Sequence, residues 1–180
     1  GDFYVDADSD GYTVGGLVSV CYGNTTPAGY STTSNGTDCD DNNGAVWQSA
    51  VLHVDSDGDG YDAGTESVCF GVSIPVGYSA TTNGSDCDDA DPTVWHLANL
   101  YIDADGDGYD NGSATVCFGL SIPVGHSTTT NGSDCDDADP MAWQSALLYV
   151  DADGDGYDGG MENVCFGLSI PSGYISTSAG

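Results

Sequence analysis

The chain has no lysine or arginine to balance its acidic side chains. Its 180 residues include 29 Asp and Glu residues, and its formal net charge is −29 at pH 7. Such a charge opposes a compact state through self-repulsion, and a low content of large aliphatic residues is typical of disordered chains. We therefore expect either a disordered chain, or a folded chain in which inorganic cations supply the positive charge and replace part of the core.

The charge balance excludes several classes of partner. A chain without Lys or Arg has no means of neutralising phosphates, so we expect neither nucleic acid nor anionic membrane surfaces as partners. No apolar run reaches the ~18 residues of a spanning helix, so we expect no membrane insertion. Gly1 is not followed by a signal peptide, and we expect a mature or excerpted form of an exported protein. Seven cysteines favour disulfides and an extracellular or cell-surface location.

The sequence repeats at a step of 48 residues. The step separates members of three series: Cys21, Cys69, Cys117 and Cys165; Cys39, Cys87 and Cys135; and Trp47, Trp95 and Trp143. Asp6 precedes its counterpart Asp55 by 49 residues, so the first repeat carries one extra residue. The repeats are residues 1–52 (repeat 1), 53–100 (repeat 2), 101–148 (repeat 3) and 149–180 (repeat 4, incomplete). We predict a tandem-repeat, calcium-stapled rod in which each repeat contacts only its neighbours.

Each repeat has the pattern of short extended pieces. In repeat 3, residues 100–102 are an apolar lead into an acidic loop, and residues 114–122 are rich in β-branched and aromatic side chains, which is typical of a strand. Asp139-Pro140 has the pattern of an N-cap followed by a first-position proline, and predicts a short helical turn that carries Trp143. The predicted fold class is short β-strands and irregular loops with little helix.

The first acidic motif, Asp-x-Asp-x-Asp-Gly, is the front half of an EF-hand-type loop. Carboxylates at positions 1, 3 and 5 converge on one hard cation, the glycine at position 6 permits the turn, and the backbone carbonyl at position 7 adds a ligand. The predicted side-chain ligands are Asp6, Asp8, Asp10; Asp55, Asp57, Asp59; Asp103, Asp105, Asp107; and Asp151, Asp153, Asp155. The predicted carbonyl ligands are Tyr12, Tyr61, Tyr109 and Tyr157.

The second acidic motif, Asp-Cys-Asp-Asp, is predicted to close the site. A complete EF-hand needs a glutamate at position 12, and only Glu66 and Glu162 fall there; repeat 1 has Leu17 (or Val18) and repeat 3 has Ala114. The candidates for closure are Asp38, Asp40, Asp41; Asp86, Asp88, Asp89; and Asp134, Asp136, Asp137. An all-oxygen site with flexible spacing favours calcium over magnesium, so we expect several calcium ions per chain.

Other chemistries fit the pattern poorly. There is no Cys-x-x-Cys, and His53, His96 and His126 stand where other repeats have Tyr or Gln, which argues against zinc or copper. Every candidate nucleophile or base is a repeated position, and metal-neutralised aspartates are poor general acids. We expect no enzyme. One Asp/Gly loop by itself could be a solvated turn. Four such loops at equivalent positions, in a chain without Lys or Arg to balance them, favour metal binding instead.

Two disulfide pairings are open. The preferred one is Cys21–Cys39, Cys69–Cys87 and Cys117–Cys135, leaving Cys165, because it closes loops of 18 residues and holds the two acidic motifs of one repeat together. The staggered alternative pairs the cysteine of each acidic cluster with the first cysteine of the next repeat, 30 residues later, and leaves Cys21 unpaired.

Five Asn-x-Ser/Thr sequons predict glycosylation. They begin at Asn24, Asn35, Asn83, Asn111 and Asn131. Since Asn-Gly is also a common hairpin turn, a purely structural role stays open for the four asparagines that precede a glycine.

The order of motifs resembles the tandem metal-binding-motif repeats of bacterial surface proteins. In repeat 3, residues 101–110, Cys117, residues 123–126 and residues 131–137 match that order, with His126 where the family has Tyr. The chain is more loosely similar to thrombospondin type-3 repeats, in which calcium replaces a hydrophobic core. The resemblance implies calcium binding and secreted or cell-surface placement. The family's Pro-Gly-Ala after the second cluster is replaced here by a Trp-bearing turn.

These observations together predict an extracellular calcium-binding structural repeat protein, a segment of a surface fibre or filament. Repeat 4 stops at Gly180, where a second cluster would be due, and this predicts head-to-tail self-association. Two alternatives stay open: a calcium-sequestering or mineral-binding acidic protein, and the spacer stalk of an adhesin.

Overall fold

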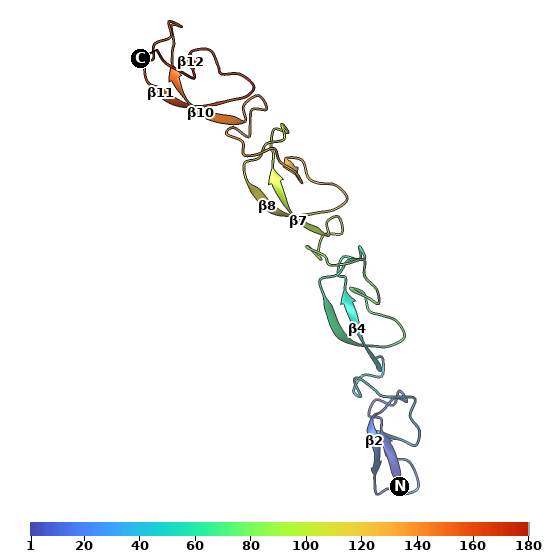
Figure 1. The fold of residues 1–180 in the computed structure, drawn as a ribbon. Helices are drawn as coiled ribbons and strands as arrows, with labels where there is room; N and C mark the ends of the chain where they lie inside the picture. Colours follow the sequence, from blue (N-terminus) through green and yellow to red (C-terminus); the bar gives the residue numbers. More distant parts are fainter. Residues whose placement is uncertain (180) are drawn as a thin grey trace. The chain divides into compact units, whose positions relative to one another are not determined.

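The computed structural model describes residues 1–179, which are all-β, with no helix among them (Figure 1). The strands are β1 (Asp2–Val5), β2 (Val14–Ser19), β3 (Tyr30–Ser31), β4 (Gln48–Val54), β5 (Thr65–Phe70), β6 (Tyr78–Ser79), β7 (His96–Ile102), β8 (Ser113–Phe118), β9 (His126–Ser127), β10 (Gln144–Val150), β11 (Met161–Phe166) and β12 (Tyr174–Ile175). The prediction of short strands with little helix is confirmed.

The strands form four sheets of the same construction. Each sheet has three antiparallel strands, with the earliest in the middle: β2-β1-β3, β5-β4-β6, β8-β7-β9 and β11-β10-β12. The β1–β2 pair alone has a register shift, between Phe3 and Val5. Repeat 1 carries one extra residue, and a bulge is the way an antiparallel pair accommodates it.

The chain divides into two compact units, residues 1–95 and 96–180. The first unit holds the sheets centred on β1 and β4, and the second holds those centred on β7 and β10. Strands β4, β7 and β10 run across the three predicted repeat boundaries, at residues 52/53, 100/101 and 148/149.

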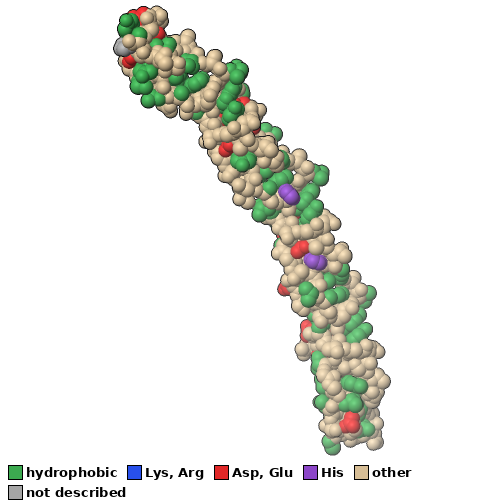
Figure 2. Space-filling view, viewed as in Figure 1, with side chains coloured by type: hydrophobic (Ala, Val, Ile, Leu, Met, Phe, Trp, Pro, Cys, Tyr) green, Lys and Arg blue, Asp and Glu red, His purple; other side chains and the backbone are tan. Residues whose placement is uncertain are grey.

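Each sheet buries one large apolar side chain on its central strand. Phe3, Leu52, Leu100 and Leu148 occupy equivalent positions and are no more than 4% exposed. Phe118 is buried as well, but many other large apolar side chains lie on the surface, where Figure 2 shows apolar side chains along the chain. Val76 and Val124 are fully exposed. Since burying one Leu or Phe contributes about 1.5–3 kcal/mol, these small cores alone cannot offset the entropy of ordering the surrounding loops.

The preferred disulfide pairing is wrong, and Cys39 and Cys135 follow the staggered alternative. Cys39 is bonded to Cys69 and Cys135 to Cys165, each pair 30 residues apart. Cys21 is free and exposed. Cys87 and Cys117 are disulfide-bonded as well. These two bonds therefore join the acidic clusters of repeats 1 and 3 to a cysteine of the following repeat.

The reason lies in the path of the chain between the cluster and the next sheet. The backbone N–H of Trp47 donates to the carbonyl of Phe70 at 3.1 Å, and the Gln48 side chain donates to the carbonyl of Gly71. This brings the segment before β4 against the end of β5, where Cys69 lies. Asp38 N–H donates to the carbonyl of Thr13 at 2.9 Å, which holds Asp38 against its own loop, whereas the next residue, Cys39, is bonded to Cys69 in the following sheet.

The predicted helical turn at Asp139-Pro140 is also wrong. Asp139 instead organises a single tight turn: its Oδ1 accepts a hydrogen bond from Met141 N–H at 3.1 Å, and its carbonyl accepts one from Ala142 N–H at 2.9 Å. The backbone N–H of Trp143 donates to Phe166, and β10 begins at the next residue. Too few residues separate the cap from the strand for a helix to form.

The structure of residues 1–179 offers no helix with the length and apolar character needed to cross a membrane.

Candidate functional site

The first acidic motif folds into a loop held by its own carboxylates. In repeat 3, Oδ1 of Asp103 accepts a hydrogen bond from Gly106 N–H at 2.7 Å, Oδ1 of Asp105 from Asp107 N–H at 3.2 Å, and Oδ1 of Asp107 from Tyr109 N–H at 2.8 Å. Such side-chain-to-backbone bonds are how Asp stabilises tight turns. One oxygen of each carboxylate is thereby fixed, which sets the direction of the other.

The glycine at position 6 has a backbone conformation that favours glycine, and it packs closely against an asparagine side chain. Gly108 has φ +92°, which side chains rarely adopt, and a Cβ there would lie 2.9 Å from Nδ2 of Asn131. The same contact pairs Gly11 with Asn35 and Gly60 with Asn83. These three asparagines are thus packed onto the loop. All five sequon asparagines are exposed, and glycosylation of any of them stays a prediction.

The second acidic motif lies against the loop of its own repeat. In repeat 3, Asp134 N–H donates to the carbonyl of Asp110 at 2.7 Å, and Oδ1 of Asp137 accepts from Ala104 N–H at 2.9 Å. The equivalent contacts in the first two repeats are Asp38 to Thr13, Ala7 to Asp41, Asp86 to Asp62, and Ser56 to Asp89. The first and last aspartates of each cluster therefore meet the loop.

The carboxylates of the two motifs converge. Oxygens of Asp6, Asp8 and Asp10 lie within 4.8 Å of one another, and so do those of Asp8, Asp38 and Asp41. Repeat 2 has the equivalent groups, with Asp57 shared between them: Asp55, Asp57, Asp59, and Asp57, Asp86, Asp89. A further acidic group contains Cys135 and Cys165, but their sulfurs are in a disulfide and are not ligands.

The same carboxylate oxygens in three repeats are buried without a hydrogen-bond partner among the described residues. They are the Oδ2 atoms of Asp8, Asp10, Asp38, Asp57, Asp59, Asp86, Asp105, Asp107 and Asp134, together with Oδ1 of Asp6. Asp6 and Asp38 as whole residues are only 6% and 5% exposed. A buried carboxylate oxygen without a partner is costly, and three of them aimed at one another are more so.

Burial, together with repulsion from neighbouring carboxylates, raises the pKa of Asp57 and Asp105. Burial raises the pKa of Asp57 above its usual value, and the carboxylates of Asp59 and Asp86 raise it further, against the opposing effect of a hydrogen bond from Asp59 N–H. Burial likewise raises the pKa of Asp105, with Asp107 and Asp134 adding to it. Like charges held together out of water disfavour the ionised form.

Aspartates outside these groups behave differently. Asp110 is 8% exposed, and its two oxygens accept hydrogen bonds from Gly112 N–H and Thr130 Oγ1. A hydrogen bond from the hydroxyl of Thr82 is the main cause of the lowered pKa of the equivalent Asp62. Burial of an aspartate is thus normally matched by donors in this fold, and the oxygens without partners are confined to the predicted ligands.

Some predicted ligands lie apart from the convergence. The middle aspartates of the clusters are exposed: Asp40, Asp88 and Asp136. In repeat 4, Asp153 and Asp155 are exposed, while Asp151 is buried and accepts hydrogen bonds from Gly154 and Gly156. Glu66 and Glu162 lie away from the loops, accepting hydrogen bonds at 2.8 Å from the hydroxyls of Tyr78 and Tyr174.

Each loop tyrosine in the first three repeats has a role that the sequence reasoning missed. The rings of Tyr12, Tyr61 and Tyr109 stack on Trp47, Trp95 and Trp143 with centroids 5.1–5.4 Å apart and interplanar angles of 10–12°. The common 48-residue step of the tryptophans was the available signal. Tyr157 is 59% exposed. The tyrosine carbonyls as ligands stay a prediction.

Comparison with protein-family models, with curated proteins and with solved structures found no match.

Proposed function

We propose that the chain is an extracellular, calcium-binding structural repeat protein, in which calcium joins the two acidic motifs of a repeat. The observation that carries this proposal is the recurrence of buried carboxylate oxygens without hydrogen-bond partners at the same three positions in repeats 1, 2 and 3. In repeat 3 the ligands would be Asp105, Asp107 and Asp134. The middle aspartates of the clusters are outside the proposed set.

A hard divalent cation suits these oxygens best. The proposed ligands are carboxylates, and the chain has no Lys or Arg that could pair with them. Calcium accepts six to eight oxygens in flexible geometry, which fits two groups that share one aspartate. A bound cation would reverse the repulsion within each group and favour the ionised carboxylates. The cation would link the two acidic motifs and neutralise their carboxylates, as structural metals do.

The rest of the chain supports an extracellular structural role. Disulfides fit an oxidising compartment, and the sheets bury too little apolar surface to be stable without additional links. The inward direction and burial of the oxygens favour enclosed ions over adsorption to a mineral surface. We propose that the chain is a segment of a surface fibre or filament. Because each unit of a repeat protein contacts only its neighbours, further repeats lengthen such a fibre without requiring a new kind of interface.

Replacing Asp105 by Ala is expected to remove a ligand shared by both acidic motifs of repeat 3. We expect calcium affinity at that repeat to fall about 100-fold, which at saturating calcium corresponds to a loss of about 2.7 kcal/mol of stabilisation. Hydrogen exchange followed by mass spectrometry should show faster exchange around β7–β9, while residues 1–95 keep their protection.

Asp136→Ala is the matched control, because Asp136 is an exposed aspartate in the same repeat. It should leave both calcium affinity and exchange unchanged. Equal effects of the two substitutions, or no effect of Asp105→Ala on calcium binding, would contradict the proposed site.

A further inference from the structure

Five asparagines of the chain are followed by glycine: Asn35, Asn43, Asn83, Asn111 and Asn131. In such a step the backbone nitrogen of the glycine can attack Cγ of the asparagine side chain and expel ammonia. Glycine is the most favourable second residue, because it has no side chain to hinder the ring that forms. The five steps differ in how the structure holds the attacking nitrogen and the amide under attack.

In four of the five steps the attacking nitrogen is already engaged. The glycine N–H donates a hydrogen bond to the side chain two residues earlier, and this bond has to break before the nitrogen can lose its proton and turn toward Cγ. These bonds run from Gly36 to Ser34 at 3.1 Å, from Gly84 to Thr82 at 3.0 Å, from Gly112 to Asp110 at 2.8 Å and from Gly132 to Thr130 at 3.0 Å.

The step at Asn43 has the opposite arrangement. Among residues 1–179, no group accepts a hydrogen bond from Gly44 N–H. Oδ1 of Asn43 accepts a hydrogen bond from Ala45 N–H at 3.3 Å, and a donor on this oxygen stabilises the negative charge that develops there when Cγ is attacked. Asn43 and Gly44 are both exposed, so water reaches them. The nitrogen is therefore free where the amide is activated.

The turn at Asn43 is one that the next two repeats make with an aspartate. Asp91 and Asp139 occupy the equivalent positions, and in all three repeats the carbonyl of this residue accepts a hydrogen bond from the N–H three residues later, at 2.9–3.1 Å. Pro92 and Pro140 follow these two aspartates, and proline has no N–H. Repeat 1 alone thus combines this turn with an attacking nitrogen, and the turn accommodates an aspartate.

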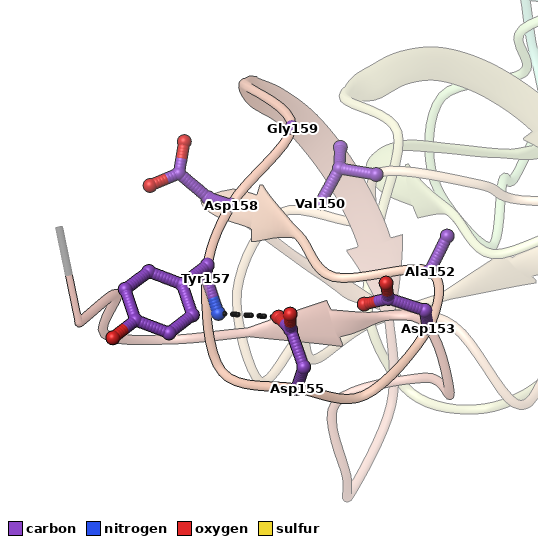
Figure 3. Close-up of a pocket in the computed structure, with 7 residues that line it drawn as sticks. All are labelled: Val150, Ala152, Asp153, Asp155, Tyr157, Asp158 and Gly159. Atoms are coloured by element: carbon purple, nitrogen blue, oxygen red, sulfur yellow. Dashed lines mark hydrogen bonds between the residues drawn. The ribbon is translucent and has the colours of Figure 1, made fainter.

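The Asp-Gly steps of the acidic loops are protected in another way. In Figure 3, Oδ1 of Asp155 accepts a hydrogen bond from Tyr157 N–H, at 2.9 Å, and the intervening Gly156 N–H donates to Asp151 at 3.1 Å. The attacking nitrogen is engaged, and an ionised carboxylate resists attack because it already carries negative charge. The corresponding two bonds hold the loop of repeat 3.

We propose that Asn43 is a site of spontaneous deamidation. The nitrogen of Gly44 bonds to Cγ of Asn43, its proton and the side-chain amino group leave as ammonia, and a succinimide ring remains. Water then opens the ring at either carbonyl and gives aspartate or isoaspartate, so no oxidant or reductant takes part. Aspartate keeps the turn, whereas isoaspartate diverts the backbone through the side chain between the acidic cluster of repeat 1 and β4. The reaction does not depend on the proposed function.

The test follows the five steps together in the whole, unglycosylated chain, kept in millimolar calcium at mildly alkaline pH. Because the chain has no Lys or Arg for trypsin, chymotryptic peptides are fragmented in the mass spectrometer to assign each conversion to a residue. We expect Asn43 to react about tenfold faster than any of the other four, since breaking a hydrogen bond adds to their barrier. A rate at Asn43 equal to or below the others overturns the inference.

Gly44→Pro tests the attacking nitrogen directly. It introduces the residue that repeats 2 and 3 have at this position and removes the N–H, so deamidation at Asn43 should stop. A Cβ at Gly44 would lie 3.4 Å from Cβ of Asp10, an ordinary contact, and circular dichroism checks that the fold is kept. Deamidation of Asn43 that continues at the original rate in this variant overturns the inference.

Thr130→Val tests the protection at another step. It removes the group that accepts the hydrogen bond from Gly132 N–H, so deamidation at Asn131 should become several-fold faster. Asn111 lies in the same repeat and keeps its own protecting bond, so its rate should not change. If Asn131 stays slow, the hydrogen-bond basis of the inference is wrong.

The outcomes separate this inference from the calcium proposal. In chelator we expect the chain to unfold, so the protecting hydrogen bonds are lost and the five rates should converge. A chain in chelator that keeps Asn43 fast and the other four slow retains the inference and contradicts calcium-dependent folding. Similar rates at all five steps in a calcium-bound, folded chain overturn the inference and leave calcium binding standing.

Discussion

Removal of calcium by a chelator is expected to convert the folded chain to a largely disordered one, with loss of the β signal in circular dichroism. The net charge of −29 is then unopposed, and each sheet retains one large buried apolar side chain on its central strand. Self-repulsion at this charge outweighs so small a core. Adding calcium back should restore the signal, since metal binding and folding are coupled when ligands come from separate segments.

A control distinguishes calcium from general ionic screening. Sodium chloride at several times the ionic strength of the calcium solution should restore only part of the structure, because screening weakens repulsion without bridging buried oxygens. A chain in chelator that keeps its β spectrum and melts sharply would contradict the role of calcium in folding.

Loss of the Cys135–Cys165 bond is expected to destabilise residues 96–180 by about 3–4 kcal/mol, from the chain-entropy estimate for a loop of this size. Replacing both cysteines by serine removes the link between the repeat 3 cluster and β11 without creating a free thiol. Denaturant unfolding in saturating calcium measures the change.

Cys21→Ser is the matched control for this experiment, because Cys21 is free and exposed. It should leave the free energy of unfolding unchanged. If the double substitution has no more effect than the control, the disulfide between successive repeats contributes little to stability.

The repeating sequence was sufficient to predict the short strands and the loops, because both depend on local patterns. Alternating and β-branched residues mark strands such as β8, and the Asp-Gly spacing marks the turn at Gly108. The convergence of Asp105 with Asp134 followed from the need to close an incomplete EF-hand. All of these signals lie within one repeat.

The disulfide register could not be predicted in the same way. An 18-residue loop and a 30-residue loop differ by less than 1 kcal/mol in closure entropy, so spacing alone does not select between them. The choice depends on how the segment after the cluster lies against the next sheet. That placement is set by the backbone hydrogen bond of Trp47 to Phe70 and by the side-chain hydrogen bond of Gln48 to Gly71. The stacking of Trp47 on Tyr12 is likewise a contact between residues far apart in the sequence, and spacing alone does not predict it.

The most direct test of the calcium-linked repeat is an anomalous difference map from crystals of the whole chain grown in calcium, recorded at a wavelength where calcium scatters anomalously. We expect peaks among the Oδ2 atoms of Asp105, Asp107 and Asp134 and at the equivalent positions of repeats 1 and 2, with oxygens about 2.3–2.6 Å away. Maps without peaks at these positions, or with peaks only at exposed aspartates such as Asp136, would contradict the calcium-linked repeat.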